Sequence, residues 1–143
     1  MTLKKKIFFL FFGISFMGMG CASTSQNQIL ATDQSQVALR NIQSRAFDTT
    51  DKKLMMRSVI NTLQDLDFLI QDSSLDLGTV TGQKFSGSTL VKISVTVKER
   101  NAKQLLIRAN AQFGLKAVEE PKVYQDFFAA LEKSVFLTAQ QVD

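Results

Sequence analysis

The sequence predicts an α+β domain, built from a largely antiparallel β-sheet with two helices packed on one face. Two long segments, 91–98 and 105–116, alternate apolar and polar side chains, which is typical of neighbouring strands with one buried and one wet face. Two other segments, 55–66 and 124–135, repeat apolar side chains at helical spacing. With the shorter strands between them, the expected order of elements is β-α-β-β-β-β-α.

The first helix is expected to follow a strand. Residues 37–47 have a mixed pattern, and we expect them to form a strand. Asp48-Thr49-Thr50-Asp51 matches a helix start, with a threonine as the N-cap and Asp51 in the first turn. The helix then carries one apolar stripe, which is more typical of a core-facing helix than of an adaptable methionine-rich groove. The stripe consists of Met55, Met56, Val59, Ile60, Leu63 and Leu66.

Shorter strands and turns fill the middle of the chain. Phe68–Ile70 suits a short strand, and Asp72-Ser73-Ser74 suits a turn. Residues 77–85 have the composition of a strand whose two glycines, Gly78 and Gly82, mark a bulge or a close backbone approach. Ser86-Gly87-Ser88 suits the next turn.

The two long strands are the clearest elements, and residues 99–102 form the short turn between them. One expected face is apolar and buried, and it carries Val91, Ile93, Val95, Val97, Leu105, Ile107, Ala109, Ala111, Phe113 and Leu115. The other expected face is wet and largely polar, and it carries Lys92, Ser94, Thr96, Lys98, Leu106, Arg108, Asn110, Gln112 and Lys116.

Glu119-Glu120-Pro121 opens the last helix, because proline suits the first turn and carboxylates suit the positive end of the helix dipole. An aromatic-rich stripe follows, which we expect to lie on the sheet. It consists of Tyr124, Phe127, Phe128, Leu131 and Val135.

The N-terminus has the layout of an export signal: a basic region at Lys4-Lys5-Lys6, an apolar run over 7–19, and Gly20 before Cys21. The apolar run is shorter than the roughly 20 residues of a transmembrane helix. An ordinary secretory signal is the other alternative. The only cysteine of the chain stands directly after this signal, and this arrangement resembles the signal of bacterial lipoproteins.

The lipoprotein resemblance implies that Cys21 carries a diacylglycerol on its sulfur and an acyl chain on its amine, and that the mature protein starts there. Ala22, rather than an aspartate, implies the outer membrane, with the domain facing the periplasm. Residues 1–20 are then a signal peptide, and 21–36 are the lipidated cysteine with a polar tether, which reaches roughly 50 Å if extended. Residues 37–143 are expected to form a single domain.

Composition excludes several kinds of chemistry. The chain has no histidine, so it has no imidazole base or imidazole metal ligand, and Cys21 is used by the anchor. We therefore expect no enzyme, no metal and no cofactor other than the covalent lipid. Three of the 17 basic residues lie in the signal, and the other 14 nearly balance 13 acidic ones. This balance and the lack of interleaved aromatic residues argue against a nucleic-acid partner.

The mature chain also resembles a family of small envelope lipoproteins from proteobacteria. The resemblance rests on the segments 45–51, 63–70, 76–84 and 124–137. The order of elements is similar to the helix-grip domains of BamC, a lipoprotein of the outer-membrane β-barrel assembly machine. This resemblance implies a helix-grip-like fold and an envelope location.

A non-catalytic adaptor of an envelope protein assembly is the function we expect, with barrel assembly, secretion and efflux machinery as candidates. The expected docking face consists of Lys92, Ser94, Thr96, Arg108, Asn110 and Gln112, and Lys84, Lys98 and Lys116 are possible additions. The alternative is a carrier of a lipid or other hydrophobic ligand between sheet and helix, where small residues leave space: Ala109, Ala111, Ala129 and Ala130. A pocket of a few hundred Å³ favours the carrier and a filled core favours the adaptor.

Overall fold

A computed structural model describes residues 35–140 of the chain. Residues 35–42 form a first helix. The elements that follow are β1 (Ser44–Phe47), α2 (Lys52–Asp65), β2 (Leu69–Ser74), β3 (Thr79–Ser86), β4 (Thr89–Asn101), β5 (Gln104–Phe113), β6 (Lys116–Ala117) and α3 (Pro121–Gln140).

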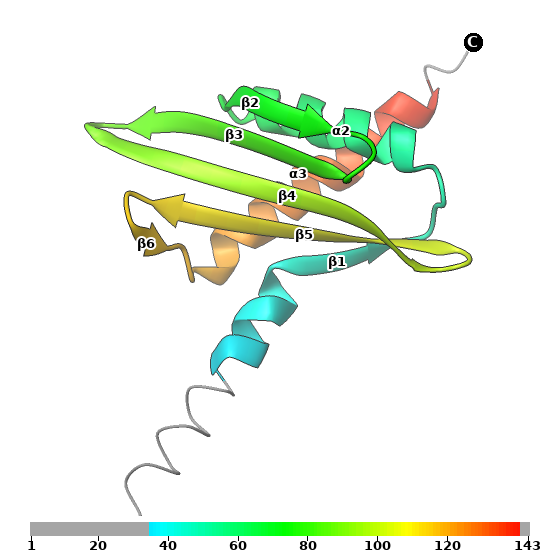
Figure 1. Cartoon of the computed structure of the whole chain (residues 1–143), viewed down its shortest axis with the longest axis horizontal. Helices are drawn as coiled ribbons and strands as arrows, with labels where there is room; N and C mark the ends of the chain where they lie inside the picture. The colour runs from blue at the N-terminus through cyan, green and yellow to red at the C-terminus, as the bar shows by residue number, and fades with distance from the viewer. Residues whose placement is uncertain (1–34, 141–143) are drawn as a thin grey trace, which may run out of the picture.

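The strands form one antiparallel sheet in the order β1-β5-β4-β3-β2, and the short strand β6 pairs with the far end of β5. Helices α2 and α3 both lie behind this sheet in the view of Figure 1, so one face is covered and the other is open. Strands β2 to β6 follow one another without a helix between them, and the strand pairs are antiparallel. The α+β class predicted from the sequence is therefore confirmed.

The core lies between the covered face of the sheet and the two helices. The alternation in β4 and β5 has the predicted direction, because Ile93, Val95 and Val97 are buried while their neighbours face outward. The helices contribute the buried side chains of the two predicted stripes, namely Met55, Met56, Val59, Leu63, Tyr124, Phe127, Phe128 and Leu131. Ile60, Leu66 and Val135 pack against this cluster while partly buried.

The start of α2 differs from the prediction in its capping residue. Asp51 is the N-cap, and its Oδ1 accepts a hydrogen bond from the backbone N–H of Leu54 at 2.8 Å. Thr49 acts one step earlier, since its hydroxyl oxygen accepts from the N–H of Asp51 at 3.2 Å. An ionised carboxylate at this position satisfies a free N–H group and also complements the helix dipole.

Other predictions near the N-terminal half of the chain were wrong. The strand expected in 37–47 is only Ser44–Phe47, because the preceding residues are helical, so the described residues hold three helices and not two. The expected turn Asp72-Ser73-Ser74 is the end of β2, which pairs with β3 up to Thr79. The actual turn follows at 75–78, where Gly78 has a positive φ of 67°.

The two glycines of the 77–85 segment have different roles. Gly78 turns the chain with its positive φ, whereas Gly82 lies within β3. Gly82 lies close to the neighbouring segment, since a Cβ there would lie 3.3 Å from the Cβ of Phe68 and 3.5 Å from the backbone oxygen of Leu69. The irregularity in strand pairing lies in β2, between Ile70 and Asp72, and not in β3. At the far end of the sheet, Gly114 turns the chain with a φ of 62°, so Leu115 is fully exposed and is not part of the predicted apolar face.

Helices α2 and α3 meet through polar side chains that the apolar stripes do not include. Ser58, Thr62, Ser134 and Thr138 are all buried. The backbone oxygen of Ser58 accepts from the hydroxyls of Thr62 at 2.8 Å and Ser134 at 3.2 Å. Small hydroxyl side chains let the two helices approach, and the hydroxyl of Ser134 joins α3 to the backbone of α2.

The expected signal peptide, Cys21 and most of the expected tether lie outside the described residues. Within residues 35–140, no helix combines the length and the apolar character needed to cross a membrane.

Candidate functional site

The open face of the sheet brings together all six residues of the expected docking face. They form three directly opposed pairs on adjacent strands: Lys92 with Gln112, Ser94 with Asn110, and Thr96 with Arg108. The central strands β4 and β5 hold the backbone of these residues in the sheet ladder, and the period of two places them on the side away from the helices. Lys92, Arg108, Asn110 and Gln112 are exposed, while Ser94 and Thr96 are half-buried.

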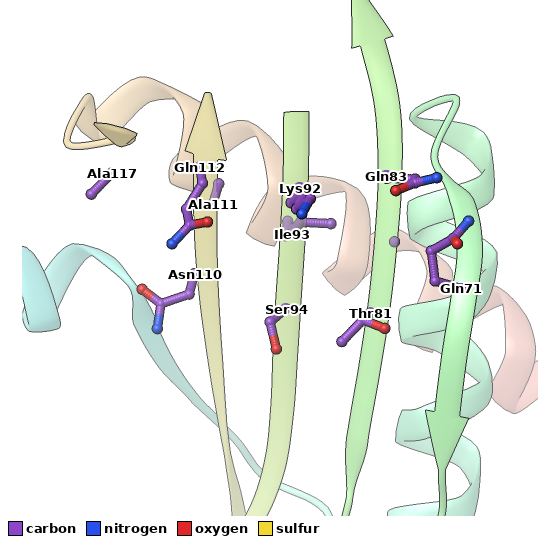
Figure 2. A pocket seen from close by; sticks show the side chains of 11 residues that line it. Gln71, Thr81, Gln83, Lys92, Ile93, Ser94, Asn110, Ala111, Gln112 and Ala117 are labelled. Carbon is purple, nitrogen blue, oxygen red and sulfur yellow. The ribbon is translucent and has the colours of Figure 1, made fainter. Parts of the chain in front are cut away.

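A hollow of about 560 Å³ lies on this face (Figure 2). Its side chains come from β2, β3, β4 and β5, and Figure 2 shows Thr81, Ser94 and Asn110 next to one another on three successive strands. The polar lining consists of Gln71, Thr81, Gln83, Lys92, Ser94, Asn110 and Gln112, with Ala117 at one side. Among residues 35–140, no carboxylate lines the hollow.

Three of these lining residues were missed by the sequence analysis: Gln71, Thr81 and Gln83. The sequence held one signal for Thr81 and Gln83 on the open face: the alternation of Thr79, Thr81 and Gln83 with Val80 and Gly82. Gly82 obscured the alternation, because it occupies an inward position without an apolar side chain. The register of β3 with β4 places Thr81 beside Ser94 and Gln83 beside Lys92.

The two cations of the expected docking face are held differently. Arg108 donates a hydrogen bond from Nε to the hydroxyl oxygen of Ser44 at 3.1 Å, which ties it to β1 and places it outside the hollow. Lys92 lies within the hollow, and it forms no ion pair among residues 35–140. The hollow therefore offers amides and hydroxyls, which both donate and accept hydrogen bonds, together with one positive charge.

Two of the additional lysines do not belong to this face. The ammonium group of Lys84 lies on the covered side, where it donates a hydrogen bond to the carbonyl oxygen of Leu66 at 2.8 Å. Lys116 is directly opposite Phe113 in the strand pairing, and the side chain of Phe113 points to the covered side. Opposed residues share a face, so Lys116 is also on the covered side. Lys98 follows the alternation of β4 and is exposed on the open side.

A second concavity, of about 500 Å³, lies between the covered face of the sheet and the first turns of α3. We call it the apolar groove. Its apolar lining consists of Leu66, Phe68, Val91, Ile93, Ala111, Phe113, Val118, Val123 and Phe127, and its charged lining consists of Lys84, Glu120 and Asp126. Of the four alanines expected to leave space, Ala111 lines the groove, whereas Ala109 is fully buried in the core.

The hollow contains amides, hydroxyls and one lysine, which do not form a nucleophile–base pair. Within residues 35–140, no cluster of three or more histidine, cysteine, aspartate or glutamate side chains is placed to hold a metal ion.

Comparisons with known proteins add little. No protein-family model matches the chain, and no curated protein matches it. Among solved structures, one similar chain is the adenylate sensor from AMP-activated protein kinase, in complex with 5-aminoimidazole-4-carboxamide 1-beta-D-ribofuranotide. It is 13% identical, with a TM-score of 0.46, over 64% of this chain and 94% of that one. A likeness at this level assigns no function.

Proposed function

We propose that this protein is an outer-membrane lipoprotein that acts as a non-catalytic adaptor of an envelope protein assembly. Its anchor would be the diacylglycerol and N-acyl lipid on Cys21, and its domain would face the periplasm. The sequence features of 1–22 support the anchor and the location. We further propose that the α+β fold is a helix-grip variant, which the antiparallel sheet along α3 supports.

The observation that carries the adaptor function is the open face of the sheet. Its six central residues form three cross-strand pairs and are not needed to fill the core. A wet sheet face of this kind is tolerated in antiparallel sheets and is available to a partner. The amides and hydroxyls suit hydrogen bonds with a protein surface, and Lys92 with Arg108 favours a partner surface that carries carboxylates.

Charge reversal of the open face tests the adaptor function. The double variant Lys92→Glu/Arg108→Glu should keep the melting temperature near that of the wild type and weaken copurification with its partners after crosslinking in the native envelope. The double variant Lys53→Glu/Lys133→Glu is a matched control, because it makes the same change of charge at exposed positions of α2 and α3. Wild-type copurification of the first variant, with normal folding, would exclude the open face as the docking site.

A second function, binding of a hydrophobic ligand, is favoured by the apolar groove. Its volume of about 500 Å³ falls within the roughly 300–1,000 Å³ of small-molecule sites. Phe113 and Val123 remain 47% and 41% exposed there, whereas Ile93, Ala111 and Phe127 lie buried in its floor and walls. Covering such apolar surface is favourable by roughly 25 cal/mol per Å².

The recessed shape favours a slender ligand over a flat protein surface. Only two of the nine apolar lining residues, Phe113 and Val123, are exposed, whereas a standard protein interface uses about 800 Å² on each partner. Binding of the neutral fluorescent probe N-phenyl-1-naphthylamine tests this function. Val123→Glu should abolish the probe signal, and Leu75→Glu, an equal change at an exposed apolar residue outside the groove, should leave it unchanged.

A further inference from the structure

The charged residues at the apolar groove differ in whether they already interact with an opposite charge. On the α3 side, Asp126 accepts a hydrogen bond from Nζ of Lys122 at 2.6 Å. This contact, with a smaller contribution from Glu120, raises the pKa of Lys122. Asp126 and Glu120, the two carboxylates at the groove, therefore both act on Lys122 in the first turn of α3.

Lys84 lies on the other side of the groove, on β3. Its side chain crosses the ring of Phe68, with Nζ 4.6 Å from the ring centroid. Its ammonium group donates to the carbonyl oxygen of Leu66, which is the C-cap residue of α2. Within residues 35–140, no carboxylate forms an ion pair with Lys84.

The hydrogen bond to Leu66 fixes the position of the Lys84 ammonium without using all of its donors. An ammonium group has three N–H bonds, and this contact uses one of them. The side chain is half-buried, so its charge is less screened by water than that of an exposed lysine. A positive charge is thus held beside an apolar groove, with two donors left for a ligand.

From this arrangement we infer that the groove selects a single-chain amphiphile whose anionic head binds Lys84 and whose hydrocarbon chain lies along the apolar lining. The shared chemistry is an apolar chain with a carboxylate or a phosphate at one end. Charge-assisted hydrogen bonds from an ammonium group to either anion are shorter and stronger than neutral ones. The inference rests on the proposed ligand binding in the groove, and it adds the head group and the residue that recognises it.

The test compares two probes with the same chain and different heads. Residues 21–143 with Cys21→Ser, purified without detergent, are first loaded with N-phenyl-1-naphthylamine. Sodium oleate and oleyl alcohol are then used to displace the probe, below the concentration at which either aggregates. We expect oleate to displace it at about tenfold lower concentration than oleyl alcohol, the effect of one hydrogen bond between charged groups.

Variants of Lys84 separate head recognition from a role in folding. Lys84→Met should bring the oleate affinity down to that of the alcohol and leave the alcohol affinity unchanged, and Lys84→Arg should retain most of the preference. Lys92→Met removes the same charge on the opposite face of the sheet and should change neither affinity. A loss of both ligands in Lys84→Met would assign Lys84 a purely structural role and overturn the inference.

Two other outcomes have different meanings. Equal displacement by oleate and oleyl alcohol from the wild-type groove would overturn the anionic selectivity while leaving hydrophobic binding in place. Absence of any probe binding to the wild type, or probe binding that Val123→Glu does not affect, would overturn the proposed ligand-binding function and the head-group inference with it.

Discussion

The hydroxyl group of Tyr124 accepts a hydrogen bond from Nε2 of Gln43 at 3.2 Å, although 81 positions separate the two residues in the chain. The same hydroxyl donates to the carbonyl oxygen of Val118 at 2.7 Å and accepts from the N–H of Ala111 at 3.3 Å. One buried oxygen atom therefore joins α3 to β5, to the loop before α3 and to the residue before β1.

Tyr124→Phe is expected to destabilise the domain by about 1–3 kcal/mol, because it leaves buried partners of the hydroxyl without a hydrogen bond. The ring and its packing are retained, so the loss reports the hydroxyl alone. Urea unfolding followed by circular dichroism measures the free energy, with Ser88→Ala, an exposed hydroxyl in a turn, as the control. Equal stability of Tyr124→Phe and the wild type would show that the network is energetically neutral.

The two faces of the sheet should respond differently to substitution. Phe127→Ala should cost about 3–5 kcal/mol through the cavity it leaves, since this side chain is 3% exposed. Val95→Asp should be at least as severe, because it places an unpaired charge at a fully buried position. Lys92→Ala on the open face should stay within about 0.5 kcal/mol. Thermal melts would contradict the assignment of faces if Lys92→Ala matched Val95→Asp.

Gly78 and Gly87 provide a matched pair for backbone strain. Both have positive φ, 67° and 61°, so alanine at either position should cost about 1–2 kcal/mol. At Gly78 the added Cβ would also fall well inside contact distance of the carbonyl oxygen of Val97, whereas at Gly87 it would meet nothing within 4 Å. We expect Gly78→Ala to cost a further 1–3 kcal/mol, roughly that of overpacking. Similar unfolding midpoints for the two variants would argue against this close contact.

Ser58→Ala is expected to be neutral or to stabilise the domain by up to about 1 kcal/mol. The hydroxyl oxygen of Ser58 is buried and has no hydrogen-bond partner in the part of the chain that the structure describes, and alanine is the better helix former. Ser134→Ala is the contrasting variant. It should destabilise the domain, because the hydroxyl it removes donates to the backbone oxygen of Ser58. If Ser58→Ala proved the more damaging of the two in urea unfolding, the hydroxyl of Ser58 would have to make a contact in solution.

Cys21→Ser should leave an unprocessed and unlipidated precursor, because serine offers no thiol for diacylation. Metabolic labelling with a clickable fatty acid, followed by gel analysis, measures the modification. Labelling of the variant at the wild-type level would refute lipidation at Cys21. The sucrose-gradient position of the wild type tests the outer-membrane location independently.

Periodicity explains how far the sequence predicted the fold. Val95 and Val97 on β4, and Leu63 and Leu131 on the helices, follow simple periods, and each is buried as expected. The partners of contacts between distant parts of the chain cannot be predicted from such periods. Gln43 gave no signal as a buried residue, since its burial depends on Tyr124 at the other end of the chain.

The same limit applies to the candidate sites. The shared face of the six residues on β4 and β5 could be predicted, because they alternate with apolar residues. Their register could not, because the turn lies at 102–103 and not at 99–102, and an irregularity in pairing lies between Glu99 and Asn101. The contribution of Gln71 to the hollow could not, because it depends on an irregularity in β2. Lys84 was placed on the wrong side because its strand is punctuated by Gly82, and its position depends on the carbonyl of Leu66.

The attachment of β1 has a mechanical consequence. A pulling force applied from the N-terminal side enters the domain at this strand, whose four residues, among the described strands, pair with β5 alone. Beside it, Gln43 contacts Tyr124, and Arg45 binds Glu132 at 2.8 Å and lies 4.9 Å above the ring of Phe128. The load is thus shared between the sheet and α3. Under tension, the strand pairing of β1 and its contacts with α3 should therefore resist extension together.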